Sequence, residues 1–123
     1  GSVMPLKKTR QLKMIAQGGC CYYCGLQMWD PALSGPPASR RKQALLRCTA
    51  EHLHARCDGG TNRAENIVAA CYYCNSGRHK RKHPPSPEAF RNHVQQRMKA
   101  GKWLAALHPD VLQQRISIRS SLA

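Results

Sequence analysis

The sequence predicts a small α+β domain that is held together by a four-cysteine zinc site and flanked by helices at both ends. Three observations carry this prediction. The chain has 123 residues, a length typical of a single domain over residues 1–123. The motif Cys-x-x-Cys occurs twice. Only 6% of the residues are aromatic, so the apolar core is thin and the fold needs another source of stability.

The charge of the chain points to a polyanionic partner. Lys and Arg total 20 against 6 Asp and Glu, which gives a formal net charge of +14. A surplus of this size favours phosphate backbones, because neutralising them releases condensed counterions. No apolar run approaches the ~20 residues of a membrane span, and residues 6–17 offer too little apolar surface for a membrane-bound helix. Nucleic acid is therefore the expected partner, the alternative being that the basic side chains serve only solvation.

The first part of the chain predicts a helix, a cysteine knuckle and a loop. Residues 5–17 have helical character, with Pro5 near the start and Gly18-Gly19 at the end. A knuckle follows over residues 20–25, and residues 30–43 are rich in Pro and Ser, which is typical of a loop. We expect no secretory leader, because the N-terminal stretch is basic where a leader would be apolar.

The middle of the chain predicts a hairpin and a helix. Residues 44–55 are apolar and tolerate β-structure, a turn follows over residues 58–62, and a short return segment runs over residues 66–69. The second knuckle, Cys71-Tyr72-Tyr73-Cys74, leads into a basic helix that ends at or before His83, since Pro84-Pro85 cannot continue it.

A helical extension is predicted over residues 86–112. Ser86-Pro87-Glu88 is a typical helix start. Phe90, Val94 and Met98 then repeat along one face before Gly101 ends the helix, and Trp103, Leu104 and Leu107 continue at helical spacing. These apolar residues indicate packing, and residues 113–123 carry no usable pattern.

The two knuckles can supply four thiolates, from Cys21, Cys24, Cys71 and Cys74, to one tetrahedral Zn²⁺. Cys20 could replace Cys21, although the two-residue spacing favours Cys21. A disulfide across each pair is the competing interpretation, which a reducing cytosol disfavours. Cys48 and Cys57 are expected to be ordinary thiols. Because zinc binding free energy becomes folding free energy, the ion would join distant segments of a thin core.

Four short segments lie between and just after the knuckles: Glu51-His52-Leu53-His54, Gly59-Gly60, Glu65-Asn66-Ile67 and Cys74-Asn75-Ser76-Gly77-Arg78-His79. This arrangement resembles the HNH endonuclease family, in its four-cysteine branch. The resemblance covers residues 20–83 and implies a ββα-metal core there. Asn75 stands in place of the last His of the motif, and Glu51 stands where Asp is more usual.

The resemblance implies a metal-dependent DNA endonuclease that hydrolyses phosphodiesters. It implies that Glu51 and Asn75 hold a catalytic Mg²⁺ or Mn²⁺ with the help of His79, that His52 is the general base, and that Asn66 ties down the loop. An imidazole ligand also admits Zn²⁺, Co²⁺ or Ni²⁺. Because no base-specific contacts are visible in the sequence, we expect low sequence specificity.

Glu51 and His52 are adjacent, and adjacent side chains of a strand point to opposite faces. Both can therefore reach one site only if the strand bends or ends at His52. His54 is either an orienting residue or an exposed histidine. Four basic side chains around the motif helix are expected to contact phosphates, rather than only solvent, namely Arg78, Lys80, Arg81 and Lys82.

Two other interpretations use the same residues. One is a non-catalytic zinc-dependent module that binds nucleic acid, and the other is an accessory subunit of a phage packaging or restriction complex that docks a larger partner through residues 86–112. For the nuclease we expect double-stranded DNA bound through its backbone, either a homodimer or a larger complex, and a cytoplasmic, nucleoid-associated protein of a bacterium or phage.

Overall fold

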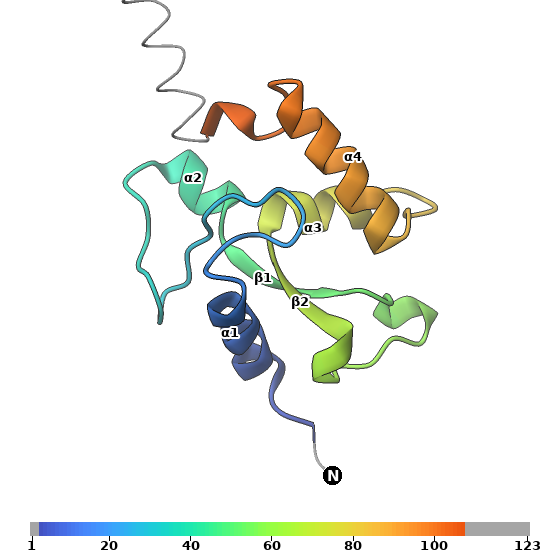
Figure 1. Cartoon of the computed structure of the whole chain (residues 1–123). Helices are drawn as coiled ribbons and strands as arrows, with labels where there is room; N and C mark the ends of the chain where they lie inside the picture. The colour runs from blue at the N-terminus through green and yellow to red at the C-terminus, as the bar shows by residue number, and fades with distance from the viewer. Residues whose placement is uncertain (1–2, 108–123) are drawn as a thin grey trace, which may run out of the picture.

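The computed structural model describes residues 3–107 of the chain (Figure 1). Its centre is a two-stranded antiparallel hairpin followed directly by a helix: β1 (Cys48–His52), β2 (Ile67–Cys71) and α3 (Tyr72–His79). Helices flank this unit, with α1 (Leu6–Ala16) before it and α4 (Pro87–Lys99) after it. The predicted fold class, a ββα core with a four-cysteine cluster and flanking helices, is confirmed.

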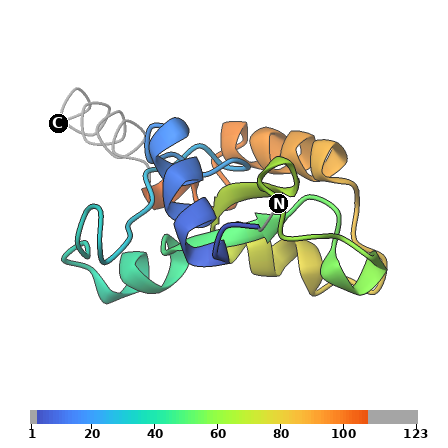
Figure 2. The ribbon, with the colours of Figure 1, turned by 90° about the horizontal axis from the view of Figure 1, so that it is seen from below.

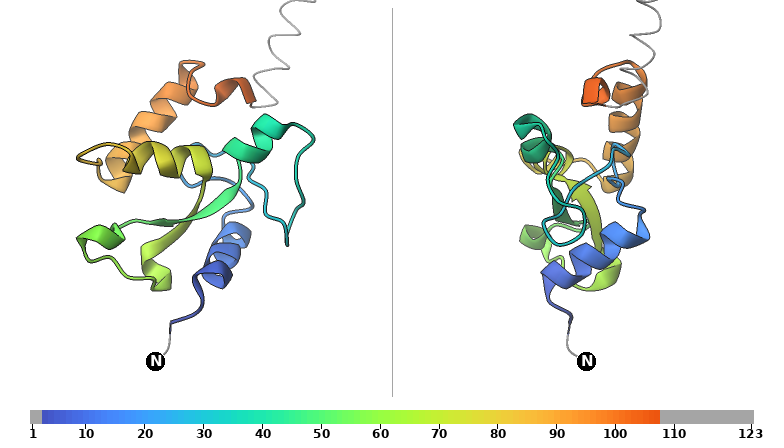
Figure 3. Two further views of the ribbon diagram at one scale, coloured as in Figure 1. Left: turned by 180° about the vertical axis from the view of Figure 1, so that it is seen from behind. Right: turned by 90° about the vertical axis from the view of Figure 1, so that its left-hand side faces the viewer.

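The hairpin register positions the ends of both strands. Cys48 pairs with Cys71 at one end, and His52 pairs with Ile67 at the other. Helices α1 and α3 each contact both strands, and the right panel of Figure 3 shows them on different sides of the hairpin. Figure 2 shows from below how α1 lies against the strands. Glu51 and His52 are expected to reach one site only if the strand bends or ends at His52. β1 does end at His52, so this condition is met.

The strand predicted over residues 44–55 is wrong at both ends. Its first residues belong to a short helix, α2 (Arg40–Leu45), which begins inside the segment predicted as a loop over residues 30–43. Ser39 caps this helix, because its hydroxyl accepts a hydrogen bond from the Lys42 amide at 3.3 Å. A short apolar run such as the one after Gln43 does not by itself distinguish helix from strand.

The C-terminal extension agrees with its predicted start. The Ser86 hydroxyl accepts a hydrogen bond from the Ala89 amide at 3.2 Å, and Phe90 and Val94 of α4 are fully buried. Between Gly101 and Leu107, where the described residues end, the chain forms a short 3₁₀ turn, Ala105–Leu107, in place of the predicted continuation at helical spacing. Residues 108–123, including the end of the predicted extension, lie outside the described residues. Within residues 3–107, no helix is long and apolar enough to span a membrane.

The core is small and includes the cysteine cluster. Its largest fully buried apolar side chains are Tyr23, Met28, Ile67 and Phe90. The rings of Tyr23 and Phe90 meet edge to face, with centroids 5.0 Å apart. These contacts join the first knuckle to α4, so the two knuckles and the C-terminal helix form one packed unit around the hairpin.

Candidate functional site

Four cysteine side chains converge where the first knuckle meets the end of the hairpin. Their sulfur atoms all lie within 4.8 Å of one another, and all four residues are buried: Cys21, Cys24, Cys71 and Cys74. The Cys24 and Cys71 sulfurs are 4.0 Å apart, close to the separation of two thiolates around a tetrahedral Zn²⁺ with bonds of about 2.3 Å. The cluster therefore fits a structural zinc ion, and Cys21, not Cys20, is its member.

Backbone amides and neighbouring thiols already stabilise negative charge on these sulfurs. The Cys21 sulfur accepts a hydrogen bond from the Cys71 amide at 3.3 Å. Burial raises the pKa of the Cys21 thiol, but hydrogen bonds with the three other thiols outweigh burial and bring its pKa well below the ordinary value. Hydrogen bonding to the Cys21 sulfur in turn raises the pKa of Cys71 and Cys74. The cluster therefore favours one thiolate, on Cys21, and further thiolates need a cation such as a zinc ion to neutralise them.

Trp103 makes a further contact to the cluster. Its indole nitrogen donates a hydrogen bond to the Cys74 sulfur at 3.3 Å. The ring also packs edge to face against Tyr73, with centroids 4.9 Å apart. Trp103 has a φ of 63°, a left-handed conformation that is rare for a bulky residue. The sequence predicts only a packing role for Trp103, and no local pattern indicates that its N–H reaches the Cys74 sulfur.

Glu51 is the carboxylate of the second site, and it is fully buried on β1. One of its oxygens, Oε2, accepts hydrogen bonds from the Tyr23 hydroxyl at 2.9 Å and from the Arg78 guanidinium at 3.3 Å. The other oxygen, Oε1, lies 2.7 Å from Nε2 of His79. Burial, together with the Glu51 carboxylate, raises the pKa of Tyr23 well above its ordinary value. Tyr23 therefore stays protonated and acts as a donor to Glu51.

His52 ends β1, and its ring is oriented by a residue of the turn. Nε2 of His52 lies 2.7 Å from Oδ1 of Asn62. An amide oxygen can only accept a hydrogen bond, so Nε2 carries the proton and Nδ1 keeps its lone pair. From the sequence, Asn62 is predicted only as a residue of the turn over residues 58–62, with no role at the site. Its contribution depends on how the loop folds back on the end of the strand.

Asn66 closes the loop that follows β1. Its amide oxygen accepts a hydrogen bond from the His54 amide at 2.8 Å, while its amide nitrogen donates to the carbonyls of His54, at 3.1 Å, and Thr61, at 2.7 Å. These three bonds hold backbone atoms of the loop, and only the backbone of His54 takes part. The His54 residue itself is exposed.

The residues predicted to act on a substrate share one solvent-open cavity of about 230 Å³. It is lined by Ala50, Glu51, His52, Ala55, Arg56, Cys57, Asn75 and His79. Asn75 donates through its side-chain nitrogen to the Thr49 hydroxyl at 3.1 Å and to the Ala50 carbonyl at 3.3 Å. This leaves the amide oxygen of Asn75 as the atom able to bind a cation.

The donor set of this cavity fits a divalent cation. Glu51 Oε1 and His79 Nε2 are hydrogen-bonded to each other at 2.7 Å, so a cation held by both atoms would take the place of the proton between them. A carboxylate, an amide oxygen and an imidazole suit Mg²⁺ or Mn²⁺, and the imidazole also admits Zn²⁺, Co²⁺ or Ni²⁺.

Arg78 does not lie where the phosphate contact predicted for it would require. Its exposed fraction is 5%, and its guanidinium donates to Glu51 and to the carbonyls of His52, Leu53 and Pro85. It is therefore a buried partner of the carboxylate. The other three basic residues of the predicted phosphate-binding set are exposed: Lys80, Arg81 and Lys82.

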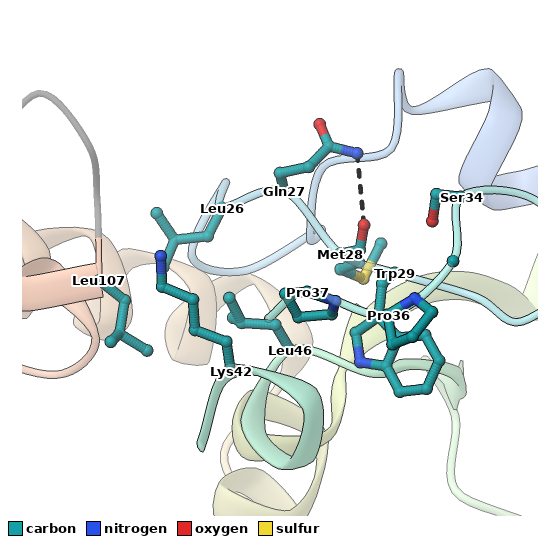
Figure 4. A pocket seen from close by; sticks show the side chains of 11 residues that line it. Leu26, Gln27, Met28, Trp29, Ser34, Pro36, Pro37, Lys42, Leu46 and Leu107 are labelled. Carbon is teal, nitrogen blue, oxygen red and sulfur yellow. Dashed lines mark hydrogen bonds between the residues drawn. The ribbon is translucent and has the colours of Figure 1, made fainter. Parts of the chain in front are cut away.

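A second, larger cavity of about 310 Å³ lies between the first knuckle, α2 and the end of the described chain (Figure 4). Apolar side chains dominate its lining, among them Met28, Trp29, Leu46 and Leu107, and among the described lining residues only Lys42 is charged. Its lining within residues 3–107 contains neither a carboxylate nor an imidazole to activate water. The smaller cavity, with Glu51 and His52, is therefore the candidate site for chemistry.

Comparison with protein families identifies the segment that carries this cavity. Residues 39–81 match the HNH endonuclease family. The match begins just before α2 and includes the hairpin and the whole of α3. Comparison with curated proteins and with solved structures gave no match.

Proposed function

We propose that this chain, which carries an HNH endonuclease domain with a four-cysteine cluster, is a divalent-metal-dependent endonuclease that cleaves phosphodiesters of DNA. The observation that carries the proposal is the shared cavity of Glu51, His52, Asn75 and His79. It combines a cation-binding donor set with an imidazole whose Nδ1 is free to accept a proton. These are the groups that hydrolysis of a phosphodiester requires.

Glu51, Asn75 and His79 would hold the catalytic cation. When bound, the cation supplies Lewis-acid stabilisation of the charge that develops on phosphoryl oxygens. Tyr23 and Arg78 hold the carboxylate through Oε2, so Oε1 stays directed towards His79. Asn75 is fixed by its bonds to β1. The protein thereby positions its donor atoms before a substrate binds.

His52 would act as the general base. Its Nδ1 takes a proton from the attacking water and the water oxygen bonds to phosphorus. The ester P–O bond to the leaving oxygen breaks, and that oxygen takes a proton from solvent water and leaves as a hydroxyl group. Asn62 holds Nε2 and fixes the orientation of the ring. An imidazole has an ordinary pKa of about 6.5 and is therefore suited to this transfer near neutral pH.

The basic surface would bind the DNA backbone. The net charge is +14, and Lys80, Arg81 and Lys82 follow directly after His79 at the end of α3. Phosphate contacts position a protein on DNA without reading its sequence, so we propose low sequence specificity. One chain carries one such cavity within residues 3–107, which favours nicking by the monomer.

The test is nicking of supercoiled plasmid in the presence of Mg²⁺ or Mn²⁺. His52→Ala should lower the rate by roughly 10²- to 10⁴-fold, the range for loss of a general base. His54→Ala is the matched control, because His54 is exposed and lies outside the cavity lining, and it should nick like the wild type. Equal nicking by wild type and His52→Ala would remove His52 from the proposed role.

A non-catalytic zinc-dependent DNA-binding module is the second candidate function. The observation in its favour is that Glu51 is fully buried, with both oxygens already in contact with protein groups. It predicts retained DNA binding and no cleavage with any divalent metal. Asn75→Ala separates the two functions, because a nuclease should lose metal-dependent turnover and a binding module should not be affected.

A further inference from the structure

The face of α3 that carries Asn75 and His79 begins with an aromatic residue, Tyr72. Tyr72 begins α3, and Asn75 and His79, which line the cavity, follow it by three and seven residues. Residues at these spacings share one face of a helix. The axial rise of 1.5 Å per residue places Tyr72 about 4.5 Å from Asn75 along the axis. Tyr72 therefore lies on the Asn75 side of the cavity, towards the Cys48 end of the hairpin, and is not one of the residues that line the cavity.

Tyr72 is exposed, although most large apolar side chains of the core region are buried. Its exposed fraction is 47%. The other aromatic residue of the same knuckle, Tyr73, packs against Trp103, and Tyr23 of the first knuckle is fully buried. No packing requirement accounts for an exposed aromatic ring at this position of α3.

Arg47 covers Tyr72 from one side. Its guanidinium carbon lies 5.7 Å from the centroid of the Tyr72 ring, and its carbonyl accepts a hydrogen bond from the Tyr72 amide at 2.9 Å. The register Cys48↔Cys71 of the hairpin places the two residues opposite each other. Arg47 is itself exposed, so its guanidinium can pair with a phosphate while it covers the ring.

Basic residues extend this surface in both directions. Arg40 and Arg41 begin α2, which contacts α3, and the left panel of Figure 3 shows α2 beside the start of α3. At the other end of α3 lie the exposed Lys80, Arg81 and Lys82. Exposed basic side chains therefore lie before the start of α3 and after its end, and Tyr72, the first residue of α3, lies beside Arg47.

We propose that Tyr72 and Arg47 form a subsite for the nucleotide next to the scissile phosphate, in which an unpaired base stacks on the Tyr72 ring and Arg47 pairs with the nucleotide's phosphate. An aromatic ring stacks on any base that is not already stacked in a duplex. The substrate class is therefore DNA that is single-stranded, or opened, at the cleavage position. The inference rests on the proposed nuclease function and specifies its substrate.

The test compares Tyr72→Leu with Tyr72→Phe and with a matched control. Tyr22 occupies the same place in the first knuckle and also lies under an arginine, with the Arg91 guanidinium carbon 4.8 Å from its ring centroid, but it is not on α3. Tyr22→Leu is therefore the control. Zinc content and thermal unfolding of all variants show whether the fold is kept.

The first measurement is the affinity for a single-stranded oligonucleotide, by fluorescence anisotropy, in the His52→Ala background. Tyr72→Leu should raise Kd by about 10-fold or more, as expected for the loss of one stacked base, while Tyr72→Phe and Tyr22→Leu should not. A 2-aminopurine in the oligonucleotide should be quenched by the protein with Tyr72 and not by Tyr72→Leu. Equal affinity and equal quenching with Tyr72→Leu would overturn the subsite.

The second measurement is cleavage by the wild type of single-stranded, bubble and duplex DNA of one sequence. We expect faster cleavage of the first two, and we expect Tyr72→Leu to remove the difference. If duplex is cut as fast as single strands and Tyr72→Leu changes nothing, the subsite is wrong while the nuclease function stands. If nothing is cleaved with any metal but the binding results hold, the nuclease function fails and the stacking site stands.

Discussion

The Tyr23 hydroxyl donates a hydrogen bond to the Glu51 carboxylate at 2.9 Å, and this bond connects the four-cysteine cluster to the candidate active site. Tyr23 lies between two of the cluster's cysteines, Cys21 and Cys24. On the other side of the cluster, Asn75 directly follows Cys74. A zinc ion that holds both knuckles therefore positions two of the side chains that line or support the cavity.

Replacement of Tyr23 by Phe should test this connection. The ring remains, but Glu51 loses one of its two donors at Oε2. Because hydrogen bonds to charged groups contribute about 1.5–3 kcal/mol, the free energy of unfolding should fall by about 2 kcal/mol and plasmid nicking should slow, while zinc content stays at one ion per chain. Urea unfolding and elemental analysis provide the measurements.

Tyr73→Phe is the matched control for that variant, since Tyr73 holds the same position in the second knuckle and contacts Trp103 through its ring. It should leave both stability and nicking unchanged. If the two variants behave alike, the Tyr23 hydroxyl has no special relation to the carboxylate.

Arg78 is the other donor to Oε2, and its loss should be more damaging. In Arg78→Met the fully buried Glu51 loses its cationic partner, and breaking a buried ion pair costs about 3–5 kcal/mol. Lys80→Met, two residues along the chain and exposed, should change stability by no more than about 0.5 kcal/mol. Similar urea midpoints for the two variants would show that Arg78 acts at the surface, as the sequence suggested.

Arg78 also shows which features of the site can be predicted from sequence. The four-cysteine cluster could be predicted because two sulfurs at Cys-x-x-Cys spacing are presented by local geometry. Arg78 lies in a basic stretch that ends at Lys82. The sequence of this stretch does not show which of its side chains face DNA and which face the protein interior. Only the packing of α3 on β1 decides that Arg78 points inward.

The same distinction applies to the elements and to the partners of the site. The starts of α1 and α4 are marked by the residues directly before them, Pro5 and Ser86, so both helices agree with prediction. The start of β1 is set by pairing with β2 and could not be read from the apolar run before it. Asn62 and Trp103 contact the site across the fold, at separations of 10 and 29 residues from His52 and Cys74, where no local signal exists.

Replacement of Trp103 by Phe should weaken zinc binding. The N–H bond to Cys74 is lost, and loss of a group that supports a metal ligand lowers metal affinity by about 10- to 100-fold. Zinc release to a chromophoric chelator should therefore occur at lower chelator concentration. Because zinc binding contributes directly to folding, loss of secondary structure by circular dichroism should accompany release in both proteins.

Trp29→Phe is the control for the loss of an indole donor, because Trp29 donates to the Gln43 carbonyl at 2.7 Å, away from the cluster. It should release zinc at the wild-type chelator concentration. Equal release from Trp103→Phe and Trp29→Phe would mean that the contact to Cys74 does not affect the metal.

Alkylation of Cys57 should block the candidate active site. Cys57 is exposed and lines the cavity with Glu51 and His52, whereas the four cluster cysteines and Cys48 are buried. A maleimide should therefore react first at Cys57, and the added group would fill a cavity of about 230 Å³. We expect treated wild-type protein to lose nearly all nicking activity while it keeps its zinc, and Cys57→Ser to retain activity after the same treatment.

Cys20→Ser is the control, because Cys20 is the remaining cysteine that is not buried, and it should be inactivated like the wild type. Full nicking activity of wild-type protein that carries the adduct on Cys57 would place the catalytic groups outside this cavity.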